Sequence, residues 1–337
     1  MSSRSSVFVE APARLHFGVL DLAGRLGRHF GGLGAAIPCP SLLLEASRSG
    51  RLTASGPDAG RALEFARMFL SFNRLPETGD LIIHRAIPSH AGLGSGTQLG
   101  LAVARALAEL HGIQVSTREL AAAVARGKRS AIGTWAFALG GFIVEGGRKV
   151  GTGDIAPLLA RYEVPSTWRC VVAVPQGQRG LSGEAEINAF DRLPPPPDRD
   201  VERVSHLVLM QLLPALVEAD LSSFGEALSA VQRITGAWFA GQQGGIFAPG
   251  PTQQLVTEMA EWGAVGVGQS SWGPAAYGLV ATDEAASALA QRVRTRLADR
   301  GLVFEGGFAP GRSPGLGGTS LIDSSFFKVY TDPPSLP

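Results

Sequence analysis

The chain has 337 residues, which is enough for two domains of ordinary size. Apolar residues make up 45% of it and charged residues 18%, a balance that indicates a globular protein with a large core and excludes a disordered chain. The formal net charge is +1 and the basic residues are dispersed, so the sequence offers no electrostatic basis for a nucleic-acid or membrane partner.

Cysteines and hydrophobic segments narrow the class further. The two cysteines, Cys39 and Cys170, lie far apart and match no metal-binding spacing, so we expect two small buried side chains. Residues 1–10 contain no apolar core of signal-peptide length, and no segment approaches the length of a membrane span. These features lead us to expect a cytoplasmic protein.

Strands and helices alternate in the predicted first half of the chain. Two strands, 6–11 and 42–46, flank a glycine-rich connection over residues 18–34. Hydrophobic periodicity then predicts the following elements: helix 60–72, strand 81–85, helix 98–111, helix 117–127 with Thr117 as its cap, and strand 142–145.

The second half begins after a predicted boundary near residues 162–168. Strand 169–175 is continuously apolar, and the four consecutive prolines at 194–197 predict a stiff surface linker. The later predicted elements are helices 201–218, 221–239, 252–262 and 284–299, and strands 264–269 and 275–282. Alternation of strands and helices in both halves predicts an α+β architecture.

The most informative segment, residues 87–98, connects strand 81–85 to the helix that follows. Its glycines precede a helix whose first-turn N–H groups lack internal partners, and the helix dipole favours negative charge there. This arrangement is typical of a phosphate-binding site. A tight strand-to-helix connection is the alternative interpretation. The segment is neither a P-loop, because no lysine follows the last glycine, nor a dinucleotide fingerprint, because its glycine spacing differs.

Three segments of this chain resemble, in order, the motifs of the GHMP kinase superfamily. They are residues 11–18 with 31–34, residues 88–98, and residues 265–274. The resemblance implies a GHMP kinase-like two-domain α+β fold. Its N-terminal domain, over residues 5–165, would be like ribosomal protein S5 domain 2 and would carry the phosphate loop. Its C-terminal domain, over residues 168–330, would be ferredoxin-like.

Two features depart from the kinases of this superfamily. Gly96 stands where the kinase loop has its second serine, and residues 129–141 contain no carboxylate to act as the base that many of these kinases use. Homoserine kinases also lack that base, so an ATP-dependent small-molecule kinase stays an alternative function. A non-catalytic, ligand-sensing relative of the kinases is a third.

Residues 14–22, 28–34, 127–133 and 180–184 resemble one non-kinase branch, the β-ribofuranosylaminobenzene 5′-phosphate synthases. That family implies a decarboxylating phosphoribosyltransferase of tetrahydromethanopterin synthesis. It joins 5-phosphoribosyl 1-diphosphate to 4-aminobenzoate or 4-hydroxybenzoate and releases carbon dioxide and diphosphate. The resemblance also implies Mg²⁺ as a cofactor and a homodimer.

The implied chemistry sets the requirements of the site. Diphosphate leaves C1 of the ribose with oxocarbenium character, the ring carbon that bears the carboxylate attacks, and loss of carbon dioxide restores aromaticity without a strong base. Preorganised donors toward the leaving group would be the largest catalytic contribution. The catalytic residues that we predict are Arg14, His16, Asp21, Arg129 and Glu184.

Substrate and metal contacts are predicted within the same segments. The predicted binding residues are Arg28, Gly31, Gly32, Ser89, Gly92, Gly94, Ser95, Gly96, Thr97, Gln98, Gly268, Ser270 and Trp272, with Ser95 and Thr97 also near the metal. For each of these residue types, a purely structural role is the alternative interpretation. The arginines and carboxylates are equally compatible with a solvated surface, His16 and Trp272 with the core, and Ser95 with a helix N-cap.

Overall fold

The structure, a computed structural model, describes residues 6–181, 183–310 and 328–330, and it confirms the α+β class with two sheets. The larger sheet has the strand order β12-β1-β2-β4-β3, with β5 and β6 paired to β2 and β7 paired to β5. Its strands are β1 (Val7–Asp21), β2 (Arg28–Ser47), β3 (Leu52–Ser55), β4 (Gly79–Arg85), β5 (Phe142–Glu145), β6 (Arg148–Lys149), β7 (Leu158–Tyr162) and β12 (Lys328–Tyr330).

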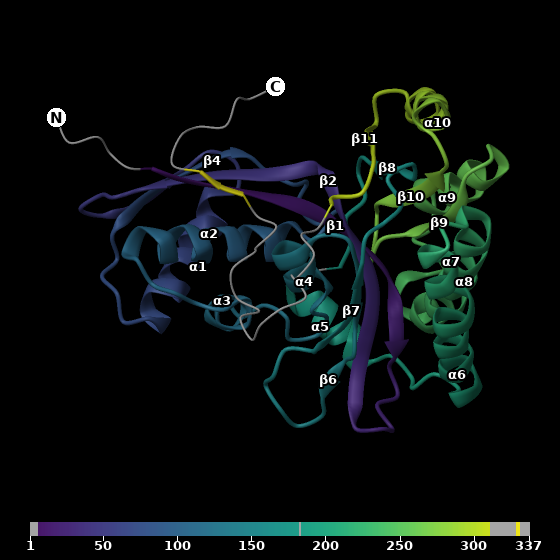
Figure 1. Cartoon of the computed structure of the whole chain (residues 1–337), viewed down its shortest axis with the longest axis horizontal. Helices are drawn as coiled ribbons and strands as arrows, with labels where there is room; N and C mark the ends of the chain where they lie inside the picture. Colours follow the sequence, from purple (N-terminus) through teal and green to yellow (C-terminus); the bar gives the residue numbers. More distant parts are fainter. Residues whose placement is uncertain (1–5, 182, 311–327, 331–337) are drawn as a thin grey trace.

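Helices cover one face of this sheet (Figure 1). They are α1 (Ala59–Phe72), α2 (Ser95–His111), α3 (Thr117–Ala123) and α4 (Ile132–Leu139). Helix α2 is the central one, because it packs on β1, β2, α1, α3 and α4. The predicted helix at 117–127 is shorter than expected, and its cap is Ser116, which forms a capping box with Glu119.

The prediction of a glycine-rich connection over residues 18–34 is wrong. Strands β1 and β2 form one long antiparallel hairpin, with pairs running from Val7↔Ala46 to Asp21↔Phe30. The glycines of β2 have a packing role instead. A Cβ added at Gly34 would lie 2.3 Å from Cγ2 of Ile132, so glycine lets α4 lie directly on the strand.

The smaller sheet has the order β11-β8-β10-β9. The elements of this half are β8 (Arg169–Pro175), α5 (Gly183–Asp191), α6 (Asp198–Leu207), the π-helix η1 (Val208–Leu212), α7 (Leu213–Val217), α8 (Leu221–Gln243), α9 (Pro251–Glu261), β9 (Val265–Gln269), β10 (Ala276–Val280), α10 (Asp283–Leu297) and β11 (Gly301–Gly306). The helix predicted over 201–218 is therefore interrupted by a π-turn, and α5 and β11 were not predicted.

After Arg169, strand β8 is apolar because both of its faces are buried. Val171 and Ala173 face a cluster formed with α9 and α10, whereas Cys170 and Val172 face the main core. Cys170 is therefore buried as predicted, but Cys39 is exposed. In the part of the chain that the structure describes, no helix combines the length and the hydropathy needed to cross a membrane.

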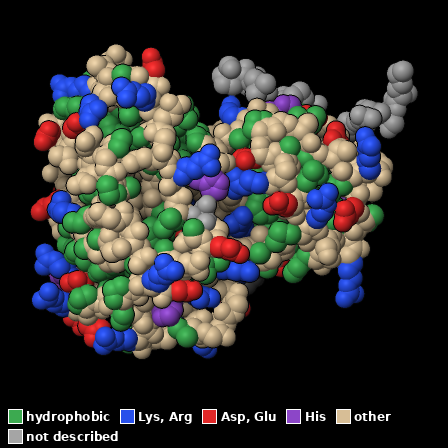
Figure 2. All heavy atoms as spheres, turned by 180° about the vertical axis from the view of Figure 1, so that it is seen from behind, with side chains coloured by type: hydrophobic (Ala, Val, Ile, Leu, Met, Phe, Trp, Pro, Cys, Tyr) green, Lys and Arg blue, Asp and Glu red, His purple; other side chains and the backbone are tan. Residues whose placement is uncertain are grey.

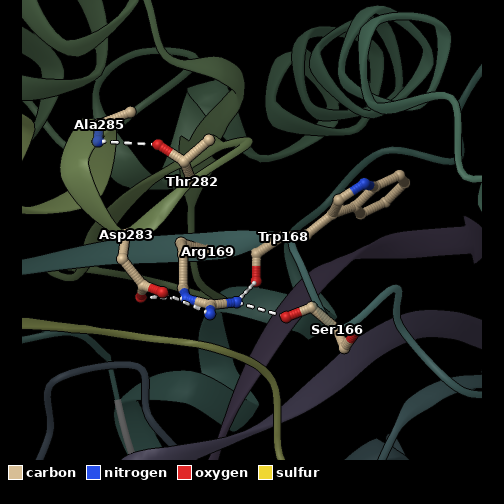
Figure 3. Close-up of polar contacts among 6 residues, drawn as sticks. All are labelled: Ser166, Trp168, Arg169, Thr282, Asp283 and Ala285. Atoms are coloured by element: carbon tan, nitrogen blue, oxygen red, sulfur yellow. Dashed lines mark hydrogen bonds and ion pairs between the residues drawn. The ribbon is translucent and has the colours of Figure 1, made fainter.

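The start of β8 is tied to the start of α10 by a side-chain network (Figure 3). The Arg169 guanidinium pairs with both carboxylate oxygens of Asp283, with 2.7 Å from Nη2 to Oδ2, and it also donates to the carbonyl of Ser166 at 2.5 Å. Thr282 caps α10, since its hydroxyl accepts the N–H of Ala285 at 3.2 Å. This network fixes the first residue of an inner strand of the smaller sheet to the helix that covers the sheet.

Candidate active site

The glycine-rich loop joins β4 to α2. Gly92 and Gly94 have φ values of 80° and 81°, which favour glycine, and Gly94 is the N-cap residue of α2. The alternative that Ser95 is the N-cap is therefore wrong, and no side chain caps this helix. Among the described residues, no acceptor bonds the N–H groups of Ser95 and Gly96. The loop thus presents free donors at the positive end of a helix dipole.

A cavity of about 640 Å³ opens over this loop. Its lining comes from both halves of the chain, from the loop and β1 on one side and from α5, α8 and residues 269–272 on the other. Figure 2 shows Lys and Arg side chains gathered along the seam between the two halves. The arginines that line the cavity are Arg14, Arg61, Arg126 and Arg129.

Arg14 holds the loop in place from β1. Its backbone N–H donates to the carbonyl of Leu93 at 3.1 Å, and its guanidinium donates to the carbonyl of Gly92. Burial lowers the pKa of Arg14 to about 10, and the nearby carboxylate of Glu186 partly opposes that shift. Nε of Arg14 is buried without a partner among the described residues. Arg14 therefore ties the loop to β1 and also lines the cavity with its guanidinium.

Gly96 allows two further guanidinium groups to approach the start of α2. A Cβ at position 96 would lie 2.6 Å from Nη2 of Arg61 and 3.5 Å from Nη2 of Arg126. Arg61 is oriented by Asp58 and by Ser89. The Ser89 hydroxyl accepts a hydrogen bond of 2.9 Å from Nη1 of Arg61. Burial and the charge of Arg61 lower the pKa of Arg126. These cations repel one another and the helix dipole, an arrangement that an anion would stabilise.

Arg129 forms an ion pair with Glu186, with 2.6 Å from Nη2 to Oε2. The carboxylate predicted here was Glu184, but Glu184 is exposed and lies outside the cavity lining. Both residues lie on α5, where two positions differ by about 200° around the helix axis. The structure therefore replaces Glu184 by Glu186 as the acidic residue of the cavity.

His16 lines the cavity but is 8% exposed. Its Nε2 lies 3.1 Å from the hydroxyl of Ser130, and the N–H of the next residue, Ala131, donates to the carboxylate of Glu145 at 3.4 Å. Burial, helped by the charge of Arg14, lowers the pKa of His16 to about 3, so the ring is neutral. Burial raises the pKa of Glu145 to about 7. Glu145 was not among the predicted residues.

Aromatic side chains form the apolar wall of the cavity. The Trp272 ring meets Phe190 at 5.4 Å and Phe239 at 4.9 Å between centroids, both nearly perpendicular. Trp272 is 7% exposed and also lines the cavity, so it packs largely in the core, and its contact with a substrate ring stays a prediction. Arg129 lies over the Phe190 ring, with 5.5 Å from Cζ to the centroid. The wall and the guanidinium together match a flat aromatic acid.

Several predicted site residues lie outside the cavity lining. The Asp21 carboxylate accepts the N–H groups of Ala23 and Gly24, at 2.6 and 3.1 Å, and shapes the hairpin turn. Arg28 is exposed and donates to the carbonyl of Gly147 at 3.0 Å. Gly31 and Gly32 lie within β2 beside β5. None of these four residues faces the ligand space as the structure describes it.

Other predicted residues support the loop from behind. The Ser270 hydroxyl donates to the carbonyl of Gly92 at 2.7 Å and accepts the N–H of His16 at 2.9 Å. Gln98 is fully buried and donates to the carbonyl of Gly133 at 2.9 Å. Gly268 lies against Gln232, where a Cβ would stand 2.4 Å from its Oε1. Ser270 and Gln98 therefore position the loop, whereas Gly268 gives room to Gln232 of α8.

The donor set of the cavity suits a magnesium ion that a substrate brings with it. Within the described ranges, no three His, Cys, Asp or Glu side chains cluster as a metal site. The lining contains one carboxylate, Glu186, beside the Ser95 and Thr97 hydroxyls. Magnesium typically binds one or two carboxylates and completes its shell with phosphates and waters. Because Glu186 is paired with Arg129, the Ser95 and Thr97 hydroxyls are the side chains that could hold it beside the phosphates.

Comparison with known proteins agrees with this architecture. Residues 61–141 match the model for the GHMP kinases N terminal domain, and residues 212–299 match the model for the GHMP kinases C terminal. A β-ribofuranosylphenol 5′-phosphate synthase of Methanothermobacter thermautotrophicus is 35% identical, over 89% of this chain and 96% of its own. The β-ribofuranosylphenol 5′-phosphate synthase of Archaeoglobus fulgidus is 33% identical, over 87% of this chain and 93% of its own.

The chain belongs to the β-ribofuranosylphenol 5′-phosphate synthase family. The non-kinase branch predicted from the sequence motifs is thereby confirmed, and members of this family are enzymes. The division into domains at residues 165–168 stays a prediction.

Solved kinases share the fold of this family. Homoserine kinase from Cytophaga hutchinsonii superposes with a TM-score of 0.68 at 18% identity, covering 98% of this chain and 99% of its own. Mevalonate kinase from L. major superposes with a TM-score of 0.67 at 14% identity, and the superposition covers 93% of this chain and 98% of the kinase. The predicted GHMP kinase-like fold is confirmed, and identities this low carry no information on substrate.

Proposed function

We propose that this chain is a decarboxylating phosphoribosyltransferase. It joins C1 of 5-phosphoribosyl 1-diphosphate to the ring carbon of 4-hydroxybenzoate or 4-aminobenzoate and releases carbon dioxide and diphosphate. The names of its relatives, which refer to a ribofuranosylphenol phosphate, support a phosphoribosylated aromatic product.

One observation carries the proposal. The Arg14, Arg61, Arg126 and Arg129 side chains line the cavity together with the free N–H groups of the α2 N-terminus. Such a density of positive charge calls for a ligand with several anionic groups. Phosphoribosyl diphosphate supplies two, a 5′-phosphate and a diphosphate. The aromatic wall of Phe190, Phe239 and Trp272 gives the benzoate ring a place in the same cavity.

Different groups of cavity residues have different roles in the proposed reaction. The donors at the start of α2, with Arg61 and Arg126, stabilise the charge that develops on the departing diphosphate. Arg129, held by Glu186 at the edge of the aromatic wall, orients the benzoate carboxylate. The Ser95 and Thr97 hydroxyls would hold magnesium, which would supply further charge stabilisation of the leaving group. Loss of carbon dioxide then returns the bonding electrons to the ring.

The test is release of labelled carbon dioxide from carboxyl-labelled 4-hydroxybenzoate or 4-aminobenzoate, with phosphoribosyl diphosphate and magnesium. We expect turnover that Arg14→Ala and Arg129→Ala each lower at least tenfold, about 1.4 kcal/mol of transition-state stabilisation. Arg199→Ala, which removes an arginine whose side chain is 86% exposed, is the matched control and retains full activity. Release no faster than in an enzyme-free blank would refute the proposal.

An ATP-dependent kinase is the competing function, favoured by the fold of the solved neighbours. Residues 129–141, which form α4 and its approach, contain no carboxylate, and Glu186 is already paired with Arg129. A base beside a nucleophilic hydroxyl is therefore missing from the described lining. Calorimetric titration discriminates the two: tight binding of ATP with no binding of phosphoribosyl diphosphate would favour the kinase.

A further inference from the structure

A buried row of polar groups leads from the cavity into the protein interior. His16 lies at the cavity wall, the Ser130 hydroxyl is 3.1 Å from its Nε2, and the Glu145 carboxylate lies beside Ser130, where it accepts the N–H of Ala131. Glu145 is 0% exposed and lies on β5, behind the wall. Neither the chemistry of the diphosphate nor the phosphate loop requires a carboxylate at this place.

Backbone donors hold the Glu145 carboxylate at the end of the row. The N–H of Gly147 donates to its Oε2 at 2.7 Å, and the N–H of Ala131, at the start of α4, donates to its Oε1 at 3.4 Å. The Ser130 hydroxyl accepts the N–H of Ile132 at 3.2 Å. If the Ser130 hydroxyl accepts from both the Ile132 N–H and Nε2 of His16, its own proton is the one that can point to the neighbouring Glu145 carboxylate.

We assign the tautomer of His16 from this arrangement, with Ser130 as the acceptor of Nε2–H. Nε2 carries the proton, and Nδ1 is left as an acceptor that takes part in no hydrogen bond among the described residues. Burial beside Arg14 disfavours an imidazolium, so the ring is suited to pass a proton on rather than to keep it. Glu145, whose burial favours the protonated acid, is suited to receive it.

We propose that Glu145 and Ser130 make His16 a proton relay for a phenolic acceptor, an inference that rests on the proposed function. The phenol proton of 4-hydroxybenzoate moves to Nδ1 of His16 while the Nε2 proton moves to Ser130 and the Ser130 proton moves to Glu145. The phenolate attacks C1 as diphosphate leaves, and the electrons of the carboxylate bond return to the ring as carbon dioxide departs. The regenerated phenolate then takes the proton back along the same row.

The relay makes a selective demand on the acceptor. The nitrogen lone pair of 4-aminobenzoate supplies electrons to the ring without loss of a proton, so this acceptor does not need the relay. A fluorinated 4-hydroxybenzoate that is already a phenolate at neutral pH does not need it either. In contrast, 4-hydroxybenzoate with its phenol intact does.

The experiment compares these three acceptors in wild type, Glu145→Gln and Ser130→Ala, with Glu202→Gln, an exposed glutamate of α6, as the matched control. We expect both relay variants to lower kcat with 4-hydroxybenzoate at least tenfold. Their kcat with 4-aminobenzoate and their KM for phosphoribosyl diphosphate should stay within twofold of wild type. With the fluorinated acceptor, the ratio of wild-type to variant kcat should fall toward one.

Each other outcome has a defined meaning. An equal loss with all acceptors in both variants, or no loss with 4-hydroxybenzoate, would overturn the relay and leave the proposed function intact. Wild type that uses 4-aminobenzoate and not 4-hydroxybenzoate would do the same. Wild type that turns over no acceptor would refute the proposed function itself, and the relay with it. Ser130→Ala keeps the test valid if Glu145→Gln fails to fold.

Discussion

At the scale of single residues, position 96 shows how a missing side chain shapes the site. The guanidinium of Arg61 occupies the space that a Cβ at Gly96 would need, and Arg126 lies beside it. Both cations are therefore able to reach an anion at the first turn of α2. A serine at this position, as in the kinase pattern, would push these groups away from the loop.

We predict that Gly96→Ser raises KM for phosphoribosyl diphosphate at least tenfold, because the added Cβ would lie 2.6 Å from Nη2 of Arg61 and displace it. Steady-state kinetics with varied phosphoribosyl diphosphate measure the effect. Gly60→Ser is the control on the neighbouring helix, since a Cβ there meets no atom within 4 Å. Unchanged KM in Gly96→Ser would remove Arg61 from the binding site.

Glu145 also makes stability depend on pH. Burial raises its pKa from 4.5 to about 7, so the folded protein binds this proton more tightly than the unfolded chain does. Its contribution to the free energy of unfolding is therefore complete below pH 4.5 and is lost as pH rises through about 7. We expect the free energy of unfolding of wild type to fall by about 2 kcal/mol between pH 5 and 8. The Glu145→Gln variant should not show this decrease.

Denaturant unfolding of both proteins at the two pH values checks this expectation. Only the difference between the two proteins is assigned to Glu145, because other groups titrate in both. His16→Asn serves as a second comparison, since burial lowers the pKa of His16 to about 3 and its contribution is lost as pH falls below about 6.5. Parallel curves for wild type and Glu145→Gln would contradict a raised pKa.

The sequence motifs identified the loop, Arg14, His16, Arg129 and Trp272, all of which line the cavity. They missed Arg61, Arg126 and Glu186 for different physical reasons. Arg61 reaches the loop because α1 packs against α2. The sequence alone does not indicate that these two helices are in contact. Arg126 directly precedes the matched segment 127–133, and Glu186 lies two positions from the predicted Glu184 on an unpredicted helix.

At the scale of elements, the main disagreement concerns the β1–β2 hairpin. Glycines at 31, 32 and 34 suggested a loop, yet β2 runs without interruption through them. They are required by the close approach of α4 and β5 to the strand, which is a tertiary contact. In the smaller sheet, where alternation and apolar runs were clear, the predicted strands 169–175, 264–269 and 275–282 are confirmed with small shifts at their ends.

The cap of α10 gives a prediction at this scale (Figure 3). Thr282→Ala removes the acceptor of the Ala285 N–H, so we expect a loss of about 1 kcal/mol in the free energy of unfolding with kcat unchanged. Chemical denaturation measures it. The control is Thr295→Ala on the exposed face of the same helix, where alanine has the higher helix propensity and costs nothing. Equal losses in both variants would argue against a cap.

At the scale of the whole molecule, the two sheets share one continuous core. Phe17 of β1 packs against Tyr277 of β10, with 5.1 Å between ring centroids, and Phe142 of β5 packs against Phe224 of α8 at 5.8 Å. The cavity lies at this junction and draws its cationic residues from the first half and its aromatic wall from the second. A ligand in the cavity therefore contacts both halves and stabilises the folded chain as one unit.

We accordingly predict a single thermal transition that moves to higher temperature when diphosphate and magnesium are added. A ligand at 100 times its Kd that binds only the folded state contributes about 2.7 kcal/mol. The double variant Arg61→Ala/Arg126→Ala should lose most of this shift, because the two guanidinium groups lie at the start of α2, where we propose that diphosphate binds. Arg199→Ala changes an exposed residue outside the cavity lining and should keep the full shift.

Differential scanning calorimetry of the three proteins measures both the number of transitions and the shift. Two separate transitions, of which diphosphate moves only one, would show that the halves unfold independently despite their common core.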